Sequence, residues 1–220
     1  MKVLLTDLFS TLIPGGDASR DKVNAQMGTI LGVDPTAFQQ AFDASSHDRF
    51  IGAYGDLPAT LRVIADRCGG TPTEAQVTEA TALRRSLARR LLAAAPAATL
   101  TTLATFKSAG WRIGLVSNIT AETQLQWPAS PLAKYYDTTA FSAEVGAAKP
   151  SPAIYLAACT ALDASPDDCL YLGDGNDNEL PGAAALGMHA IRTTEHADNA
   201  PDWPGQSVTS FAALRDWLGD

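Results

Sequence analysis

The order of the hydrophobic patterns along the chain constrains its fold more than any other feature. One short apolar run at residues 3–6 is followed by a long stretch with helical spacing, and strand-like apolar runs return only after residue 110. Helical patterns alternate with these later runs, the last of them at residues 211–218. The later runs cover residues 111–116, 138–142, 169–172 and 189–192. Such alternation predicts an α/β fold with a doubly wound, Rossmann-like parallel sheet.

The stretch after the first predicted strand has a pattern of its own. From residue 15 to residue 95, apolar side chains recur at helical spacing, and turns rich in Gly and Pro divide the stretch into about four helices. We therefore expect an α/β core formed by residues 1–14 and 96–220, and an all-helical insert formed by residues 15–95. The arginine pairs at positions 84–85 and 89–90 are expected to lie on the solvated face of an insert helix.

Charge and targeting signals restrict the classes of partner. The chain has 16 Lys and Arg against 24 Asp and Glu, and its net charge of -8 argues against binding to nucleic acid or to an anionic membrane. A few local cations can still hold a small anionic metabolite. The N-terminal apolar run is too short for a signal peptide, and no run reaches the roughly 18 apolar residues of a membrane span. We therefore expect a cytoplasmic protein, whose three cysteines, without C-x-x-C spacing, are buried thiols.

Polar side chains gather where the predicted strands end. Four segments end these strands or follow them closely: residues 7–11, 117–118, 149–150 and 173–179. In open α/β sheets, ligands bind at the carboxyl ends of the strands, so the four segments are expected to be parts of one site. Burying polar groups without a use is costly, which favours a functional interpretation.

The residue types in these segments fit a hydrolase with a carboxylate nucleophile. Asp7 and Asp174 would converge if their strands are neighbours, and with Glu179 they would form an oxygen-donor site suited to Mg²⁺. Lys149 would offset further negative charge, and residues 117–118 would bind substrate oxygens. Asp7 could then attack in line and form a covalent intermediate such as an aspartyl-phosphate.

In this order and at these spacings, the four segments resemble the four motifs of the haloacid dehalogenase-like (HAD) superfamily, and the helical insert is similar to its C1-type cap. The motifs are D-x-x-x-T at residues 7–11, Ser117, Lys149, and Gly-Asp at residues 173–174 with Glu179. The resemblance implies a hydrolase, with Mg²⁺-dependent dephosphorylation of a small phosphorylated metabolite favoured. The implied catalytic residues are Asp7 and Lys149, the substrate-binding residues Thr11, Ser117 and Asn118, and the metal ligands Asp7, Asp174, Glu179 and the main-chain carbonyl of Phe9.

Phe9 departs from the pattern of the superfamily's phosphatases. They usually carry a second Asp at this position, which protonates the leaving oxygen and then activates water, and Phe can do neither. An aromatic residue here, like Asn118, resembles the superfamily's metal-independent 2-haloacid dehalogenases, whose leaving halide needs no proton. Three hypotheses follow: a Mg²⁺-dependent phosphatase, which the retained Asp174 and Glu179 favour, a 2-haloacid dehalogenase-like hydrolase, and a catalytically impaired ligand-binding member.

Two further assignments have alternatives. Glu179 lies five positions after Asp174, which fits the superfamily's spacing for the second acidic ligand, and Asp177 is the alternative. Three residues of the insert are candidates to replace the missing acid or to hold substrate: Asp48, Arg49 and Asp56. Of these, Arg49 could clamp an anion.

Overall fold

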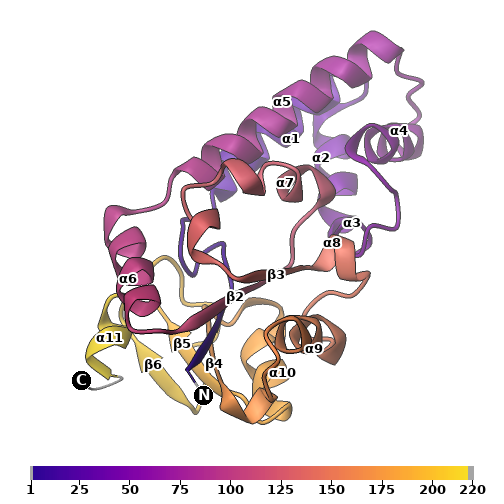
Figure 1. The fold of residues 1–220 in the computed structure, drawn as a ribbon. Helices are drawn as coiled ribbons and strands as arrows, with labels where there is room; N and C mark the ends of the chain where they lie inside the picture. Colours follow the sequence, from indigo (N-terminus) through magenta and orange to yellow (C-terminus); the bar gives the residue numbers. More distant parts are fainter. Residues whose placement is uncertain (1, 218–220) are drawn as a thin grey trace.

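A six-stranded parallel sheet forms the centre of the fold (Figure 1). The structure, a computed structural model, describes residues 2–217. The strands are β1 (Val3–Thr6), β2 (Arg112–Ser117), β3 (Thr138–Phe141), β4 (Cys169–Gly173), β5 (His189–Thr193) and β6 (Gln206–Val208). They lie in the order β3-β2-β1-β4-β5-β6, and all neighbours are parallel. The strand order therefore reverses at β1, which places the ends of β1, β2 and β4 beside one another.

Alternating side chains of the central strand build a core on each face of the sheet. Leu4 belongs to one hydrophobic cluster, which includes Leu103 and Phe106 of α6. Val3 and Leu5 belong to a second cluster on the opposite face, against α9 and α10. The helices that follow the insert are α6 (Ala97–Ser108), α7 (Ala121–Gln124), α8 (Ser142–Val145), α9 (Pro152–Ala161), α10 (Glu179–Ala185) and α11 (Ala213–Trp217), with 3-10 turns at Trp127–Ala129, Ala133–Tyr135, Pro166–Asp168 and Asn176–Asn178. Burial on both faces explains why the central strand β1 is an apolar run up to Thr6.

Between β1 and α6 the chain forms five helices that extend away from the sheet (Figure 1). They are α1 (Asp17–Ile30), α2 (Pro35–Ala44), α3 (Ser46–Phe50), α4 (Leu57–Arg67) and α5 (Glu74–Ala93). We refer to residues 17–93 as the helical insert. Side-chain caps begin three of these helices, at Asp34, Asp56 and Thr73. The insert has a hydrophobic cluster of its own, centred on side chains such as Met27, Phe38 and Leu61.

The predicted α/β fold with a parallel sheet is confirmed. The five predicted strands agree with the observed ones to within one residue at each end. The edge strand β6 was not predicted, because Gln206 and Ser207 are polar and exposed and form no apolar run. The predicted closing helix begins at Ala213, two residues later than expected, and its last predicted residue, Leu218, lies outside the described residues. The division into two domains stays a prediction.

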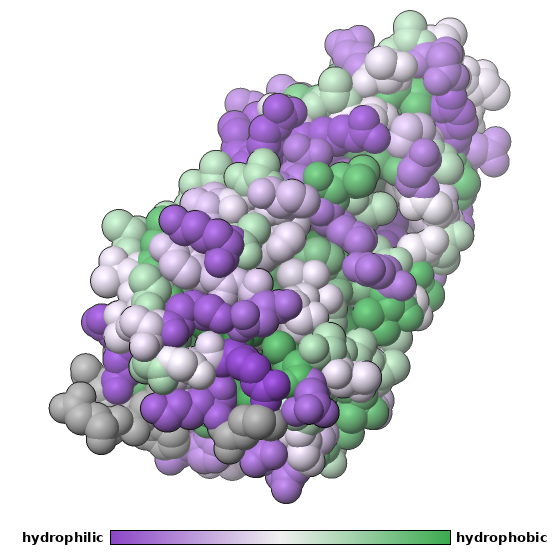
Figure 2. Space-filling model, in the orientation of Figure 1, coloured by the Kyte–Doolittle hydropathy of each residue, from purple (hydrophilic) through white to green (hydrophobic). Residues whose placement is uncertain are grey.

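On the face drawn in Figure 2, hydrophilic residues spread over both the helical insert and the sheet region. None of the described helices combines the length and apolar composition that crossing a bilayer requires. Cys159 and Cys169 are free and buried, as expected, whereas Cys68 is half-buried.

Candidate active site

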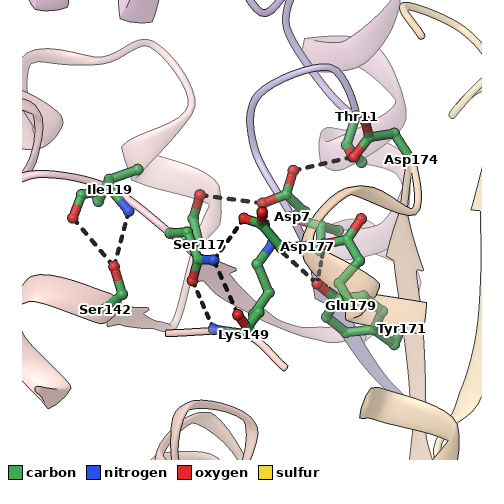
Figure 3. Close-up of polar contacts among 12 residues, drawn as sticks. Asp7, Thr11, Ser117, Ile119, Ser142, Lys149, Tyr171, Asp174, Asp177 and Glu179 are labelled. Carbon is green, nitrogen blue, oxygen red and sulfur yellow. Dashed lines mark hydrogen bonds and ion pairs between the residues drawn. The ribbon is translucent and has the colours of Figure 1, made fainter. Parts of the chain in front are cut away.

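The segments predicted to form one site meet at the carboxyl ends of β1, β2 and β4 (Figure 3). Thr6, the last residue of β1, pairs with Leu115 of β2 and with Leu172 of β4. The next residue, Asp7, is fixed by its N–H, which donates to the carbonyl of Leu172 at 2.9 Å. Ser117 ends β2, so its side chain faces the same point. The parallel register alone therefore brings the side chains of β1 and its two neighbours together.

Three donors hold the carboxylate of Asp7. Lys149 Nζ lies 2.5 Å from Oδ1, and Ser117 Oγ donates to the same oxygen at 3.2 Å. Thr11 Oγ1 donates to Oδ2 at 3.2 Å, across one turn of the loop that follows β1. All four side chains are buried, Asp7 with 6 % of its surface exposed. The carboxylate is therefore fixed in one orientation at the base of the site.

Lys149 forms a second ion pair, with Glu179. Its Nζ lies 2.6 Å from Oε2 of Glu179, an oxygen that also accepts from the hydroxyl of Tyr171 at 2.7 Å. Burial alone would lower the pKa of Lys149, but the carboxylates of Asp7 and Glu179 raise that pKa well above its ordinary value. Burial raises the pKa of Glu179, and Lys149 opposes this rise. One protonated lysine therefore bridges two buried carboxylates.

The loop after β4 is shaped so that Glu179 can reach back to the strand end. Gly175 adopts a φ of 96°, and its N–H donates to Oε1 of Glu179 at 2.9 Å. A side chain at Gly173 would place its Cβ 2.1 Å from that same Oε1. Asp177 and Asn178 are also left-handed, with φ of 54° each. A glycine at position 173 and a tight loop are thus conditions for a buried Glu179.

Asp174 carries the one carboxylate oxygen of this group that lacks a partner. Within the described part of the chain its Oδ1 is buried and accepts no hydrogen bond, whereas Oδ2 accepts from Asn199. Burial raises the pKa of Asp174, and the charge of Asp7 raises it further. Oxygens of Asp7, Asp174 and Glu179 all lie within 4.8 Å of one another. An unpartnered buried oxygen among three carboxylates fits a hard cation such as Mg²⁺, which prefers oxygen ligands.

The structure brings Glu179, and not Asp177, into this carboxylate group. Asp177 is exposed, and its carboxylate accepts from Asn118 Nδ2 at 2.7 Å. Asn118 also accepts from the main-chain N–H of Lys149 at 2.8 Å. Its amide group therefore joins three loops of the site, in addition to lining the cavity above them.

A cavity of about 460 Å³ lies between these strand ends and the helical insert. Asp7, Ser117, Lys149 and Asp174 line it from the sheet side. Three arginines line it from the insert: Arg20, Arg49 and Arg84. The two other insert residues considered from the sequence, Asp48 and Asp56, do not line the cavity.

Phe9 and Arg49 have defined contacts in the cavity wall. The guanidinium of Arg20 lies 4.5 Å from the centre of the Phe9 ring. Arg49 stacks over Phe42 at 3.9 Å and donates to the carbonyl of Phe42 at 3.0 Å and to Ser45 Oγ at 3.1 Å. Burial lowers the pKa of Arg49 to about 10, and the charge of Arg84 lowers it further.

The prediction that Arg84 is solvated is wrong. Its side chain is 5 % exposed and forms an ion pair at 3.0 Å with Glu122 of α7, whose side chain is 4 % exposed. Arg84 also donates to Oδ1 of Asn24 at 3.1 Å. The sequence spacing could have indicated that Arg84 is buried, because it lies four residues after Ala80 and three before Leu87, on the packed face of α5.

Comparisons with known proteins bear on the family and the fold of this chain. A family model described as haloacid dehalogenase-like hydrolase matches residues 1–187. A glyceraldehyde 3-phosphate phosphatase of Methanopyrus kandleri is 23 % identical over 197 residues, which cover 87 % of this chain and 83 % of that protein. The crystal structure of a HAD phosphatase from Thermococcus onnurineus matches with a TM-score of 0.72 and 20 % identity, covering 100 % of this chain and 98 % of that one. An L-2-haloacid dehalogenase structure matches with a TM-score of 0.69 and 22 % identity, over 99 % and 98 %.

Proposed function

Because the chain belongs to the haloacid dehalogenase-like hydrolases, we propose that it is a Mg²⁺-dependent phosphohydrolase that acts on a small phosphorylated metabolite with Asp7 as nucleophile. The observation that carries this proposal is the buried, unpartnered Oδ1 of Asp174 beside Asp7 and Glu179. A metal-independent reaction gives no reason to keep this carboxylate so close to the nucleophile. The similarity to a relative named as a glyceraldehyde 3-phosphate phosphatase supports the phosphate ester as substrate.

In the proposed reaction, the carboxylate of Asp7 attacks the phosphorus atom, the P–O bond to the leaving group breaks, and an aspartyl-phosphate forms. Water then attacks this intermediate and releases phosphate and Asp7. Lys149, which contacts Asp7 at 2.5 Å, supplies a positive charge beside the reacting oxygens, and Ser117 supplies a hydroxyl donor there. Thr11 holds the second oxygen of Asp7 and so fixes the direction of attack.

Asp7, Asp174 and the main-chain carbonyl of Phe9 are the proposed ligands of Mg²⁺. When bound, the ion supplies positive charge that reduces the repulsion between the substrate phosphate and the carboxylates. Glu179 is the third proposed acidic group of this site. Its Oε2 accepts from Lys149 and Tyr171 and its Oε1 from Gly175, so it also holds Lys149 in place.

Phe9 is expected to limit the rate of the proposed hydrolysis, because it stands where a general acid and base would be needed. A general acid or base typically contributes about 10²–10⁴-fold to the rate, and the phenyl ring offers no proton. Esters with a good leaving group, which departs without protonation, are therefore the expected fast substrates.

The experiment that tests the proposal is hydrolysis of p-nitrophenyl phosphate. We expect phosphate release with Mg²⁺, none with excess EDTA, and none from Asp7→Asn. The matched control is Asp66→Asn, which changes an exposed aspartate of α4 in the same way and should leave the rate unchanged. Release that persists in EDTA would overturn the metal dependence, and release from Asp7→Asn would overturn the nucleophile.

One observation favours a second candidate, a 2-haloacid dehalogenase-like hydrolase. The aromatic Phe9 supplies no proton, and a leaving halide needs none. In that reaction Asp7 would displace halide from carbon and form an ester, which water then hydrolyses. Halide release from 2-chloropropionate in the presence of EDTA, together with no hydrolysis of p-nitrophenyl phosphate, would establish this candidate instead.

A further inference from the structure

The wall that the helical insert contributes to the cavity carries a surplus of buried positive charge. Arg49 and Arg84 are buried and Arg20 is half-buried, whereas Glu122 is the buried carboxylate that faces them, paired with Arg84. Among the described residues, this leaves two of the three guanidiniums without a buried counter-charge. The carboxylates that line the same wall are all exposed to solvent: Asp17, Asp21 and Asp43. Water screens exposed charges far more than buried ones, so the wall presents a positive field to the cavity.

Arg20 is the arginine of this wall that keeps its end groups available. Arg84 donates to Glu122 and Asn24. Arg49 donates to Phe42 of α2, to Ser45 between α2 and α3, and to Ser46 of its own helix. Arg20 donates through Nε to the carbonyl of Gly15 at 2.8 Å, and no hydrogen bond or ion pair within residues 2–217 involves its Nη atoms. Burial lowers the pKa of Arg20 to about 10, and the charge of Arg84 adds to this effect, so its guanidinium is still protonated at neutral pH.

The position of Arg20 is fixed from two sides. Its Nε is tied to the loop that follows β1, and its guanidinium plane lies over the ring of Phe9, two residues after the nucleophile. A guanidinium held in this way loses little conformational freedom when it binds an anion. It faces the same cavity as Asp7 and Lys149 but comes from the opposite wall.

We propose that Arg20 binds a second anionic group of the substrate, so that the preferred substrates are small phosphate esters with a carboxylate or a second phosphate at their far end. This inference rests on the proposed phosphohydrolase function. The cavity of about 460 Å³ holds a small metabolite between the two walls. The phosphate that reacts lies at Asp7, and the second anion lies against Arg20.

Three synthetic esters with the same three-carbon chain test this proposal. Propyl phosphate ends in a methyl group, 3-phosphonooxypropionate in a carboxylate, and propane-1,3-diyl bisphosphate in a second phosphate. The measured quantity is the ratio of kcat/KM for each doubly anionic ester to that for propyl phosphate, with Mg²⁺. We expect a ratio well above one in the wild type, and the larger of the two ratios identifies the anion that Arg20 prefers.

Arg20→Gln should lower these ratios roughly 10- to 100-fold, which is the usual effect of losing a hydrogen bond to a charged group. Arg20→Lys should retain part of the preference, because it keeps the charge but not the fork of donors. Arg89→Gln is the matched control, since Arg89 is exposed on α5 and does not line the cavity, and it should leave the ratios unchanged. The melting temperature of each variant identifies any that fails to fold.

The outcomes separate this inference from the proposed function. Wild-type ratios near one, or ratios that Arg20→Gln leaves unchanged, would overturn the role of Arg20 while phosphatase activity stands. The proposed function fails only if the wild type does not hydrolyse p-nitrophenyl phosphate, whose leaving group needs no proton. If none of the three alkyl esters is hydrolysed, calorimetry decides the inference with the same compounds. Tighter binding of the bisphosphate than of propyl phosphate, lost in Arg20→Gln, would support it, and equal binding would overturn it.

Discussion

The ion pair between Arg84 and Glu122 predicts that the helical insert and the helix α7 are strongly coupled. The two residues lie on elements that are distant in sequence, their side chains are 5 % and 4 % exposed, and their atoms approach to 3.0 Å. Removing one partner of a buried pair leaves a charge with neither water nor counter-ion, which typically costs roughly 3–5 kcal/mol. We therefore expect Arg84→Met and Glu122→Leu each to lower the free energy of unfolding by about that amount.

The double variant should behave differently from the sum of the two single variants. With both charges gone, apolar side chains of similar volume fill the space, and such replacements are often neutral within about 1–2 kcal/mol. A double-mutant cycle should therefore give a coupling free energy of at least about 3 kcal/mol, which is a large share of the roughly 5–15 kcal/mol that stabilises a typical domain.

The assay is urea denaturation at pH 7, followed by circular dichroism. Arg89→Met, on the exposed face of the same helix, is the control and should change the free energy of unfolding by less than about 0.5 kcal/mol. Hydrogen exchange should also become faster in α5 and α7 of each single variant. Single variants that cost less than about 1 kcal/mol, or a double variant that costs the sum of both, would refute the reasoning.

Glu122, Asp174 and Phe9 each have a measurable effect of their own. Burial alone would raise the pKa of Glu122, but Arg84 holds this pKa below its ordinary value of 4.5 in the folded protein. Protonation of Glu122 at lower pH removes the ion pair from the wild type. The destabilisation caused by Glu122→Leu, measured by urea midpoints, should therefore be constant above about pH 4.5 and should shrink at lower pH. Asp174→Asn should raise the melting temperature in EDTA, because it removes a buried, unpaired carboxylate oxygen, and should abolish the stabilisation by millimolar Mg²⁺ that we expect for the wild type; a Mg²⁺ shift that survives the substitution contradicts the proposed ligand. Phe9→Asp should increase the hydrolysis of alkyl phosphates by up to about 10²–10⁴-fold, and an unchanged rate would mean that the site is not arranged for phosphate.

The sheet and the meeting of its strand ends could be predicted because the signals are local. Unbroken apolar runs identified the central strands, and the polar residue that follows each run identified its carboxyl end. Since all the strands of an alternating β-α pattern point the same way, Asp7, Ser117 and Asp174 had to lie at one edge. Neither Tyr171 nor Asn199 could be assigned to the site in this way, because one is a strand residue and the other contacts Asp174 from a distant loop.

The wall of the cavity that belongs to the insert was harder to predict, because its contacts join segments far apart in sequence. Nothing local to Arg20 indicates that its guanidinium will lie over Phe9, or that Glu122 will bury the charge of Arg84. The arginine pair at 84–85 has the composition of a solvated face, and only its spacing against Ala80 shows that one member is buried. Composition alone therefore predicted a solvated position for Arg84, which is buried and lines the cavity.

The most direct test of the central claim is to trap the covalent intermediate on Asp7. The enzyme is mixed with p-nitrophenyl phosphate and Mg²⁺, quenched in acid within the first turnovers, and the peptide that carries Asp7 is examined by mass spectrometry. We predict a phosphoryl group on Asp7, dependent on Mg²⁺ and absent from the Asp7→Asn variant. An unmodified Asp7 during phosphate turnover, or an ester of Asp7 formed from 2-chloropropionate in EDTA with no phosphorylation, would contradict the account.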